Sequence, residues 1–318
     1  MKNYLDTLPK PFLVLAPLDD VTDTVFRRVI ASCASPDLFF TEFTNVDALQ
    51  SPGRQNTLKR LQYTGKEQPL IAQIWGKTPE NFYKTAQELV EMGFVGIDIN
   101  MGCPDKAVVK NGCGGGLIEN RQLASEIIQA TQEGAGGKIP ISVKTRIGFK
   151  EYDPDWLQHV LSHKLNMLSI HLRTVKEMSL VPAHWELADE VRNLRDKVSP
   201  TTSLVGNGDV MSRNQAEELA EKHNYDGIMI GRGVFHDPFV FSAASPWETY
   251  SKNQKLDLYQ RHIELFAATW GDARKLHTLN KFCKIYINGF AGAKELRDKL
   301  MHAGSAKELL ELIQTARD

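Results

Sequence analysis

The sequence has no marked excess of charge of either sign and no long apolar segment. Its 318 residues include 38 Lys and Arg against 39 Asp and Glu, a formal net charge of −1. A nucleic-acid ligand would therefore need a local basic surface. No uninterrupted apolar run approaches the roughly 20 residues of a membrane span, and Met1–Lys10 lacks the apolar core of a signal peptide. We therefore expect a cytoplasmic protein with no membrane partner.

Cysteine is also scarce. The four cysteines, Cys33, Cys103, Cys113 and Cys283, show no CxxC spacing. This pattern argues against a zinc site, and it suits free thiols in a reducing compartment. We expect no bound metal. With 42% hydrophobic residues, the chain can bury a sizeable core, and its length allows one large barrel with a small second domain.

Apolar runs rich in β-forming residues alternate with amphipathic stretches up to about residue 231. Repeated strand–helix units predict a parallel sheet. Eight such units within about 220 residues favour closure into a (β/α)8 TIM barrel over a doubly wound open sheet. The expected strands are Phe12–Leu15, Leu38–Thr41, Leu70–Ile74, Val95–Ile99, Ile139–Val143, Met167–Ile170, Ser203–Val205 and Gly227–Ile230.

The pattern changes after Pro238, because residues 246–318 contain no convincing strand. Apolar residues recur there at helical spacing. The expected helices are Leu256–Trp270, Leu276–Gly289, Ala293–His302 and Ala306–Ala316. We therefore predict a catalytic α/β barrel over residues 1–241 and a C-terminal helical domain over residues 246–318.

Chemically useful residues follow almost every expected strand. Any one has an ordinary alternative: Cys103 could be a small buried hydrophobe, and His171 a satisfied core histidine. Together they would form a dense polar cluster at one mouth of the barrel, which costs desolvation free energy unless it binds something. In chain order the residues are Ala16, Pro17, Leu18, Gln73, Asn100, Cys103, Lys144, Arg146, His171, Arg173, Asn207, Gly208, Asp209, Gly231 and Arg232.

The last two strand ends indicate a phosphorylated cofactor. Loops after the seventh and eighth strands of such barrels often bind phosphate through backbone N–H groups. Asn207-Gly208-Asp209 and Gly231-Arg232-Gly233 fit this role, since Arg232 can donate two hydrogen bonds to phosphate oxygens. Gln73 and Lys144 could then hydrogen-bond the polar edge of an aromatic ring system such as a flavin. The run Gly112–Gly116 lacks the dinucleotide-binding pattern, and we interpret it as a flexible loop beside Cys103.

These motifs resemble those of the tRNA-dihydrouridine synthases. The resemblance covers residues 12–240 in order, and the helical tail agrees with the C-terminal domain of that family. Its most specific element joins an Asn-x-Gly-Cys-Pro motif to later Lys-x-Arg-x-Gly and His-x-Arg-Thr motifs. The matching segments are Ala16-Pro17, Thr41–Phe43, Gln73, Asn100–Pro104, Lys144–Gly148, His171–Thr174, Asn207–Asp209 and Gly231–Gly233.

The resemblance implies reduction of the C5–C6 double bond of uridine in tRNA by FMN, which NADPH or NADH has reduced. Cys103 would be the general acid that protonates C5 while hydride reaches C6. Asn100 would contact the uracil, with Glu42, Arg146 and Arg173 lining the uridine pocket. The expected FMN ligands are Ala16, Pro17, Leu18, Gln73, Lys144, His171, Asn207, Gly208, Asp209, Gly231 and Arg232.

The resemblance implies that basic residues in the tail, residues 246–318, bind tRNA; the alternative is a solvated helix surface. They are Lys252, Lys255, Arg261, Arg274, Lys275, Lys281, Lys284, Lys294, Arg297 and Lys299. Two other functions remain open. One is an FMN barrel acting on a small substrate, similar to dihydroorotate dehydrogenase or an ene-reductase. The other is an RNA-binding relative without catalysis. We expect the protein to be monomeric.

Overall fold

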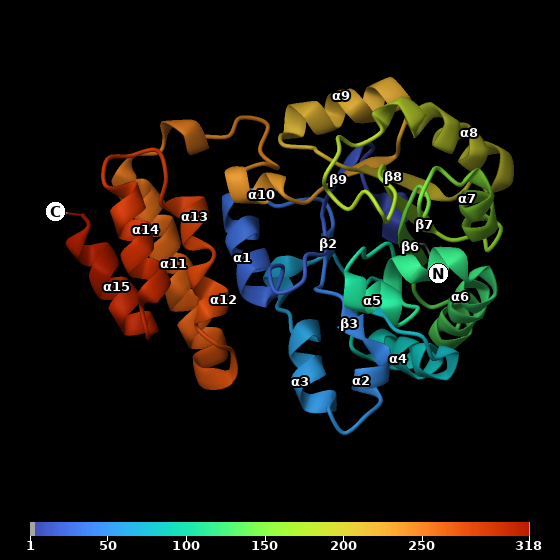
Figure 1. The fold of residues 1–318 in the computed structure, drawn as a ribbon, viewed down its shortest axis with the longest axis horizontal. Coiled ribbons are helices and arrows are strands. Elements are labelled where there is room, and N and C mark those ends of the chain that lie inside the picture. The colour runs from blue at the N-terminus through green and yellow to red at the C-terminus, as the bar shows by residue number, and fades with distance from the viewer. Residues whose placement is uncertain (1–3, 318) are drawn as a thin grey trace.

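The computed structural model describes residues 4–317, and its larger part is a parallel barrel surrounded by helices (Figure 1). The strands follow the order β1-β9-β8-β7-β6-β5-β4-β2, and β3 pairs with β4 beside this path. Their bounds are β1 Phe12–Leu15, β2 Phe39–Phe40, β3 Thr44–Asn45, β4 Leu70–Trp75, β5 Gly96–Met101, β6 Ile141–Arg146, β7 Met167–His171, β8 Ser203–Asn207 and β9 Gly227–Ile230.

The barrel closes between its first two strands. β1 pairs with β9 in parallel, and an isolated parallel bridge joins Val14 to Leu38, next to β2. Inward-pointing side chains fill the interior, among them Val14, Ile71 and Met167. The interior is therefore a packed core, which leaves the mouth at the carboxyl ends of the strands for a ligand. The predicted TIM barrel is confirmed.

Amphipathic helices cover the outside of the barrel. In α4, Phe82, Ala86 and Leu89 recur at helical spacing and are buried, while Pro79 occupies the first turn. The helices up to β9 are α1 Thr24–Cys33, α2 Val46–Leu49, α3 Arg54–Leu58, α4 Pro79–Glu91, α5 Lys106–Lys110, α6 Arg121–Ala135, α7 Pro154–Leu161, α8 Ala188–Val198 and α9 Arg213–His223.

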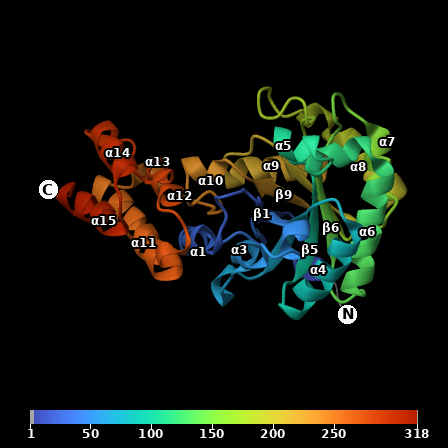
Figure 2. The ribbon, with the colours of Figure 1, turned by 60° about the horizontal axis from the view of Figure 1, so that its bottom comes forward.

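The chain after β9 contains helices and no strand within the described residues. The helices are α10 Gly233–His236, α11 Lys252–Trp270, α12 His277–Asn280, α13 Cys283–Tyr286, α14 Ala293–His302 and α15 Ala306–Thr315. The single helix expected over Leu276–Gly289 is instead two short helices. In both ribbon views these C-terminal helices lie on the α1 side of the barrel (Figures 1 and 2). No helix of the described residues is long and apolar enough to cross a membrane.

Aromatic packing and buried ion pairs attach the C-terminal helices to the barrel. Phe26 of α1 stacks on Phe282, with ring centroids 5.1 Å apart. Asp23, the N-cap of α1, accepts hydrogen bonds from Trp270 Nε1 at 2.8 Å and from Arg274 Nη1 at 3.1 Å. Because Asp23 is buried, its carboxylate requires these donors.

Candidate active site

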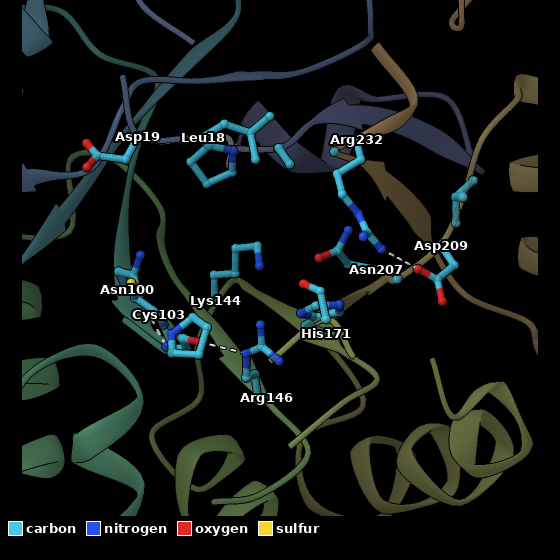
Figure 3. Close-up of a pocket in the computed structure, with 18 of the residues that line it drawn as sticks. Leu18, Asp19, Asn100, Cys103, Lys144, Arg146, His171, Asn207, Asp209 and Arg232 are labelled. Atoms are coloured by element: carbon cyan, nitrogen blue, oxygen red, sulfur yellow. Dashed lines mark hydrogen bonds and ion pairs between the residues drawn. The ribbon is translucent and has the colours of Figure 1, made fainter. Parts of the chain in front are cut away.

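A cavity of about 320 Å³ opens at the carboxyl ends of the barrel strands (Figure 3). Lys144 reaches into its middle, Asn100 and Cys103 lie on one side, and His171 and Arg232 lie on the other. Thirteen of the sixteen predicted site residues line this cavity. They are Ala16, Pro17, Leu18, Asn100, Cys103, Lys144, Arg146, His171, Asn207, Gly208, Asp209, Gly231 and Arg232.

The loops after β8 and β9 present backbone donors that have no protein acceptor. Among the described residues, the N–H groups of Gly208, Asp209, Gly231 and Arg232 make no backbone or side-chain hydrogen bond. Gly208 has φ of +135°, and a Cβ there would meet the Cβ of Ala183 at 2.6 Å. Only glycine allows this backbone path. The resulting cluster of free N–H groups is a site for an anion.

Asp209 holds the cationic side chain of this anion site in place. Its carboxylate pairs with Arg232 Nη2 at 2.6 Å and with buried Arg173. Its Oδ2 also accepts from the N–H of Ala183 at 2.9 Å. These donors lower the pKa of Asp209, although partial burial opposes them. The backbone N–H of Asp209 is therefore available to an anion, while the carboxylate of Asp209 positions Arg232.

The centre of the cavity holds the ammonium group of Lys144 and the neutral imidazole of His171. Burial, together with the nearby Arg146, lowers the pKa of Lys144 to about 8. The Lys144 ammonium makes no hydrogen bond or ion pair within residues 4–317. Burial and surrounding cations hold the pKa of His171 well below its usual range. Arg173 Nη1 donates to His171 Nε2 at 3.1 Å, so the neutral ring carries its proton on Nδ1.

Lys144 should make binding of the FMN that the sequence predicts depend on pH. The pKa of about 8 applies to the free protein, and an electron-rich ligand beside the ammonium would raise it. The complex then holds more proton than the free protein, so affinity falls as pH rises. We expect FMN affinity to drop roughly threefold to tenfold between pH 7 and pH 9. Fluorescence titration of FMN would measure the drop, and Lys144→Met should abolish it. An equal drop in that variant would contradict the prediction.

Cys103 is half-buried, and its segment is held from two sides. Asn100 Oδ1 accepts from the N–H of Cys103 at 3.0 Å and from that of Gly102 at 3.2 Å. Arg146 Nε donates to the carbonyl of Gly102 at 2.8 Å. Burial raises the pKa of the Cys103 thiol. The thiol therefore keeps its proton at neutral pH, as a general acid must.

Arg146 joins the Cys103 segment to the loop after β7. Its Nη1 donates to the carbonyls of Thr174 at 2.9 Å and Met178 at 2.8 Å. Burial, together with the neighbouring Arg173, lowers the pKa of Arg146 to about 10. Arg146 lines the cavity as predicted, but most of its donors are committed to backbone carbonyls.

The glycine-rich run after Cys103 is a packed 3₁₀-helix, which differs from the expected flexible loop. It spans Gly114–Glu119, and Gly114 and Gly115 are buried. The N–H of Gly115 donates to the Cys103 carbonyl at 2.9 Å. A Cβ at Gly115 would meet Val175 Cγ2 at 2.7 Å. The glycines therefore allow close packing against the Cys103 segment. Cys113 is buried outside the cavity lining.

Three predicted site residues lie outside the cavity lining. Gln73 is buried beneath it and bonds to Asn100. Arg173 contacts His171 and Asp209 instead of the open space. Glu42 is fully buried and pairs with Arg274 Nη2 at 2.7 Å and Arg60 Nη1 at 3.1 Å. All three side chains support neighbours of the cavity.

Sequence reasoning missed two polar residues below the cavity and several around its rim. Asp98 is fully buried and accepts hydrogen bonds from Ser142 Oγ and Gln73 Nε2. An acidic residue inside the apolar run 94–99 was an available signal. The missed rim residues carry no sequence signal of this kind; they include Asp19, Ser179, Val210 and Met211.

The fold and the cavity define a class of protein. A closed parallel barrel, with an anion site after its last two strands and a protonated thiol opposite it, is characteristic of an enzyme with a phosphorylated cofactor. The sequence matches the family described as Dihydrouridine synthase (Dus) over residues 14–318. The chain belongs to this family.

Curated relatives and solved structures agree with this assignment. A protein named "Probable tRNA-dihydrouridine synthase" from Staphylococcus aureus (strain COL) is 50% identical over 316 residues, covering 98% of this chain and 95% of the relative. "Probable tRNA-dihydrouridine synthase 2" from Bacillus subtilis (strain 168) is 48% identical, covering 98% and 96%. The structure titled "Morphinone reductase" aligns with a TM-score of 0.53 at 13% identity, covering 74% of this chain and 86% of that one. This last similarity concerns the fold alone.

Proposed function

We propose that this protein reduces the C5–C6 double bond of specific uridines in tRNA to dihydrouridine, acting as a monomer in the cytoplasm. The observation that carries the proposal is the placement of Cys103, with a raised pKa, across the cavity from the anion site, with Lys144 between them. Family membership and the names of relatives about half identical to the chain support it.

The residues around the cavity fit FMN. Free N–H groups of Gly208, Asp209, Gly231 and Arg232 would receive the phosphate, together with the guanidinium of Arg232. Lys144 and His171 would contact the flavin ring, with Ala16, Pro17 and Leu18 along its other edge. The unpartnered Lys144 ammonium suits the negative charge of a reduced flavin. We further propose NADPH as the reductant of the flavin.

In the reaction, the protein's own groups position uracil and deliver a proton. The flavin supplies the hydride when it is bound. Asn100 contacts the uracil, and the thiol of Cys103 donates its proton to C5. Delivery from the thiol requires that it stay protonated until the base arrives, which burial ensures. The uridine must leave its stack to reach a cavity at the barrel mouth.

A direct assay tests this function. The purified protein should bind FMN, oxidise NADPH and form dihydrouridine in tRNA that lacks the modification, as measured by nucleoside mass spectrometry. The competing hypothesis, an FMN barrel with a small substrate, predicts turnover of orotate or an enone without tRNA. Turnover of a small substrate together with no dihydrouridine would contradict the proposal. Absence of flavin binding would instead favour an RNA-binding relative without catalysis.

We propose that the C-terminal helices, residues 246–318, form a domain that binds tRNA. Some basic residues of this segment are committed to structural contacts. Lys255 bonds to Asn288, Arg274 to Asp23 and Glu42, and Arg297 to the carbonyl of Ile287. Lys281 donates to the carbonyl of Asp20 on the barrel. The exposed lysines without such a contact in the described part of the chain are Lys275, Lys284, Lys294 and Lys299.

Replacing these four lysines by alanine should weaken tRNA binding and flatten its salt dependence. Fewer counterions are released when fewer cations neutralise phosphates, and the slope should fall by about one for each lysine that contacts a phosphate. FMN affinity should not change. Binding titrations at several salt concentrations would measure both effects. A matched control replaces four exposed lysines near the opposite ends of the strands: Lys138, Lys164, Lys197 and Lys222. Equal effects in both variants would place the RNA surface elsewhere.

A further inference from the structure

A chain of hydrogen bonds runs from the barrel interior to the Cys103 segment. Ser142 Oγ donates to Asp98 Oδ1 at 2.5 Å, and Gln73 Nε2 donates to Asp98 Oδ2 at 2.7 Å. Asn100 Nδ2 donates to Gln73 Oε1 at 3.0 Å. Asn100 Oδ1 then accepts from the backbone N–H groups of Gly102 and Cys103. The chain connects neighbouring strands β4, β5 and β6 beneath the cavity.

The two ends of this chain fix its direction. Burial raises the pKa of Asp98 to about 6, so its carboxylate is still mostly ionised at neutral pH. An ionised carboxylate only accepts hydrogen bonds, and a backbone N–H only donates them. Asp98 therefore requires the NH₂ of Gln73, which turns the Gln73 oxygen toward Asn100. The NH₂ of Asn100 must then face Gln73, and its oxygen faces the N–H groups of the Cys103 segment. Reversing either amide would place two donors or two acceptors in contact inside a buried network, which is costly.

We propose that Asp98 is a positioning residue, and that its acceptor sets the direction of the Gln73–Asn100 chain and thereby the placement of Cys103. Asp98 does not touch the cavity, since it is fully buried and absent from its lining. It acts by orienting both amides. As a result Asn100, which lines the cavity, presents a fixed face toward a ligand. The effect on catalysis rests on the proposed role of Cys103, but the orientation of the amides does not.

Asp98→Ala removes the acceptor and should release the Cys103 segment. Amide hydrogen exchange at Gly102 and Cys103 should become at least about tenfold faster, because an N–H that loses its acceptor is less protected. Alkylation of the Cys103 thiol should accelerate several-fold, with Cys33 of the same chain as an internal reference. Reoxidation of reduced flavin by tRNA should slow at least about tenfold, a larger factor than any change in flavin reduction by NADPH.

Asp98→Asn should behave almost as the wild type. Its amide oxygen can still accept from Gln73 while its NH₂ donates to Ser142 Oγ, so the direction of the chain is retained. Ser169→Ala is a control for the loss of a buried polar group, because Ser169 is a buried barrel serine whose hydroxyl has no partner among the described residues. It should leave exchange at Gly102 and Cys103 unchanged. If Asp98→Asn were as impaired as Asp98→Ala, charge rather than direction would matter, and the proposal would be overturned.

A second variant keeps the test decisive if Asp98→Ala does not fold. In the double variant Asp98→Asn with Ser142→Ala, the NH₂ of the introduced asparagine loses its acceptor, so nothing selects which of its atoms faces Gln73. Each single replacement should have a small effect on amide exchange and on flavin reoxidation by tRNA. The double variant should show the fast exchange and slow reoxidation of Asp98→Ala. If the effects of the two single replacements on exchange and on the tRNA step simply multiplied in the double variant, the proposal would be overturned. Because exchange and alkylation need no flavin or tRNA, they report on Asp98 even if the proposed reaction is wrong.

Discussion

Replacing Cys103 by alanine should slow the reoxidation of reduced flavin by tRNA by about 10²–10⁴-fold, the usual range for a lost general acid. Binding of FMN and its reduction by NADPH should continue, because neither step uses the thiol. The structure supports the assignment, since burial raises the pKa of Cys103 and the cavity places it opposite His171. Single-turnover reoxidation, followed by flavin absorbance after NADPH has been removed, separates the tRNA step from the others.

Cys113→Ala is the matched control for this experiment. Cys113 lies ten positions along the same glycine-rich segment, but it is buried and does not line the cavity. Its replacement should leave reoxidation nearly unchanged. A wild-type rate in Cys103→Ala, or a slow step in Cys113→Ala instead, would show that the acid has been assigned to the wrong residue.

Replacing Arg232 by alanine should weaken FMN binding by about 1.5–3 kcal/mol, the contribution of a charged hydrogen bond. That corresponds to roughly a 10- to 150-fold rise in Kd. Arg232 lines the anion site, where Asp209 fixes its guanidinium. Its removal leaves the Asp209 carboxylate facing the phosphate with one cation fewer. Fluorescence titration of FMN into the flavin-free protein would measure the change.

Arg213→Ala tests whether loss of any nearby arginine has this effect. Arg213 is also half-exposed and ion-paired, with Glu217 at 2.7 Å, but it lies outside the cavity lining. Its replacement should leave the Kd of FMN within about twofold, because surface ion pairs contribute little. If Arg232→Ala binds FMN as tightly as the wild type, the phosphate lies elsewhere.

The barrel was predictable because its strands are nearly continuous apolar runs. Phe12–Leu15 and Gly227–Ile230 have the predicted bounds, and both are fully buried. Other strands are longer than predicted: β6 continues through Lys144 and Arg146, and β8 through Asn207. The polar side chains at these strand ends interrupt the apolar pattern, because at the mouth of a barrel they face a ligand cavity instead of an apolar core. The two-residue strand β3 is too short to produce a sequence pattern.

Most of the cavity lining could be predicted, because strand order alone brings the carboxyl ends of parallel strands together. The hydrogen-bond and ion-pair partners of individual side chains could not be predicted. Glu42 pairs with Arg274, which is 232 positions away, and no local pattern reveals such a contact. Gln73 was expected at the ligand, but its role depends on Asp98, whose acidic side chain looks out of place in a buried strand until its donors are known.

The buried carboxylates of Asp23 and Glu42 fix the position of the C-terminal helices on the barrel. Arg274 joins both of them, and Trp270 also bonds to Asp23. The angle between the C-terminal helices and the barrel mouth is therefore set by buried polar contacts rather than by the length of the connecting segment 241–247. Under the proposed function, an RNA held on those helices would meet the thiol of Cys103 at a constant offset. Selection of a uridine by its distance along the folded RNA would follow from this fixed geometry.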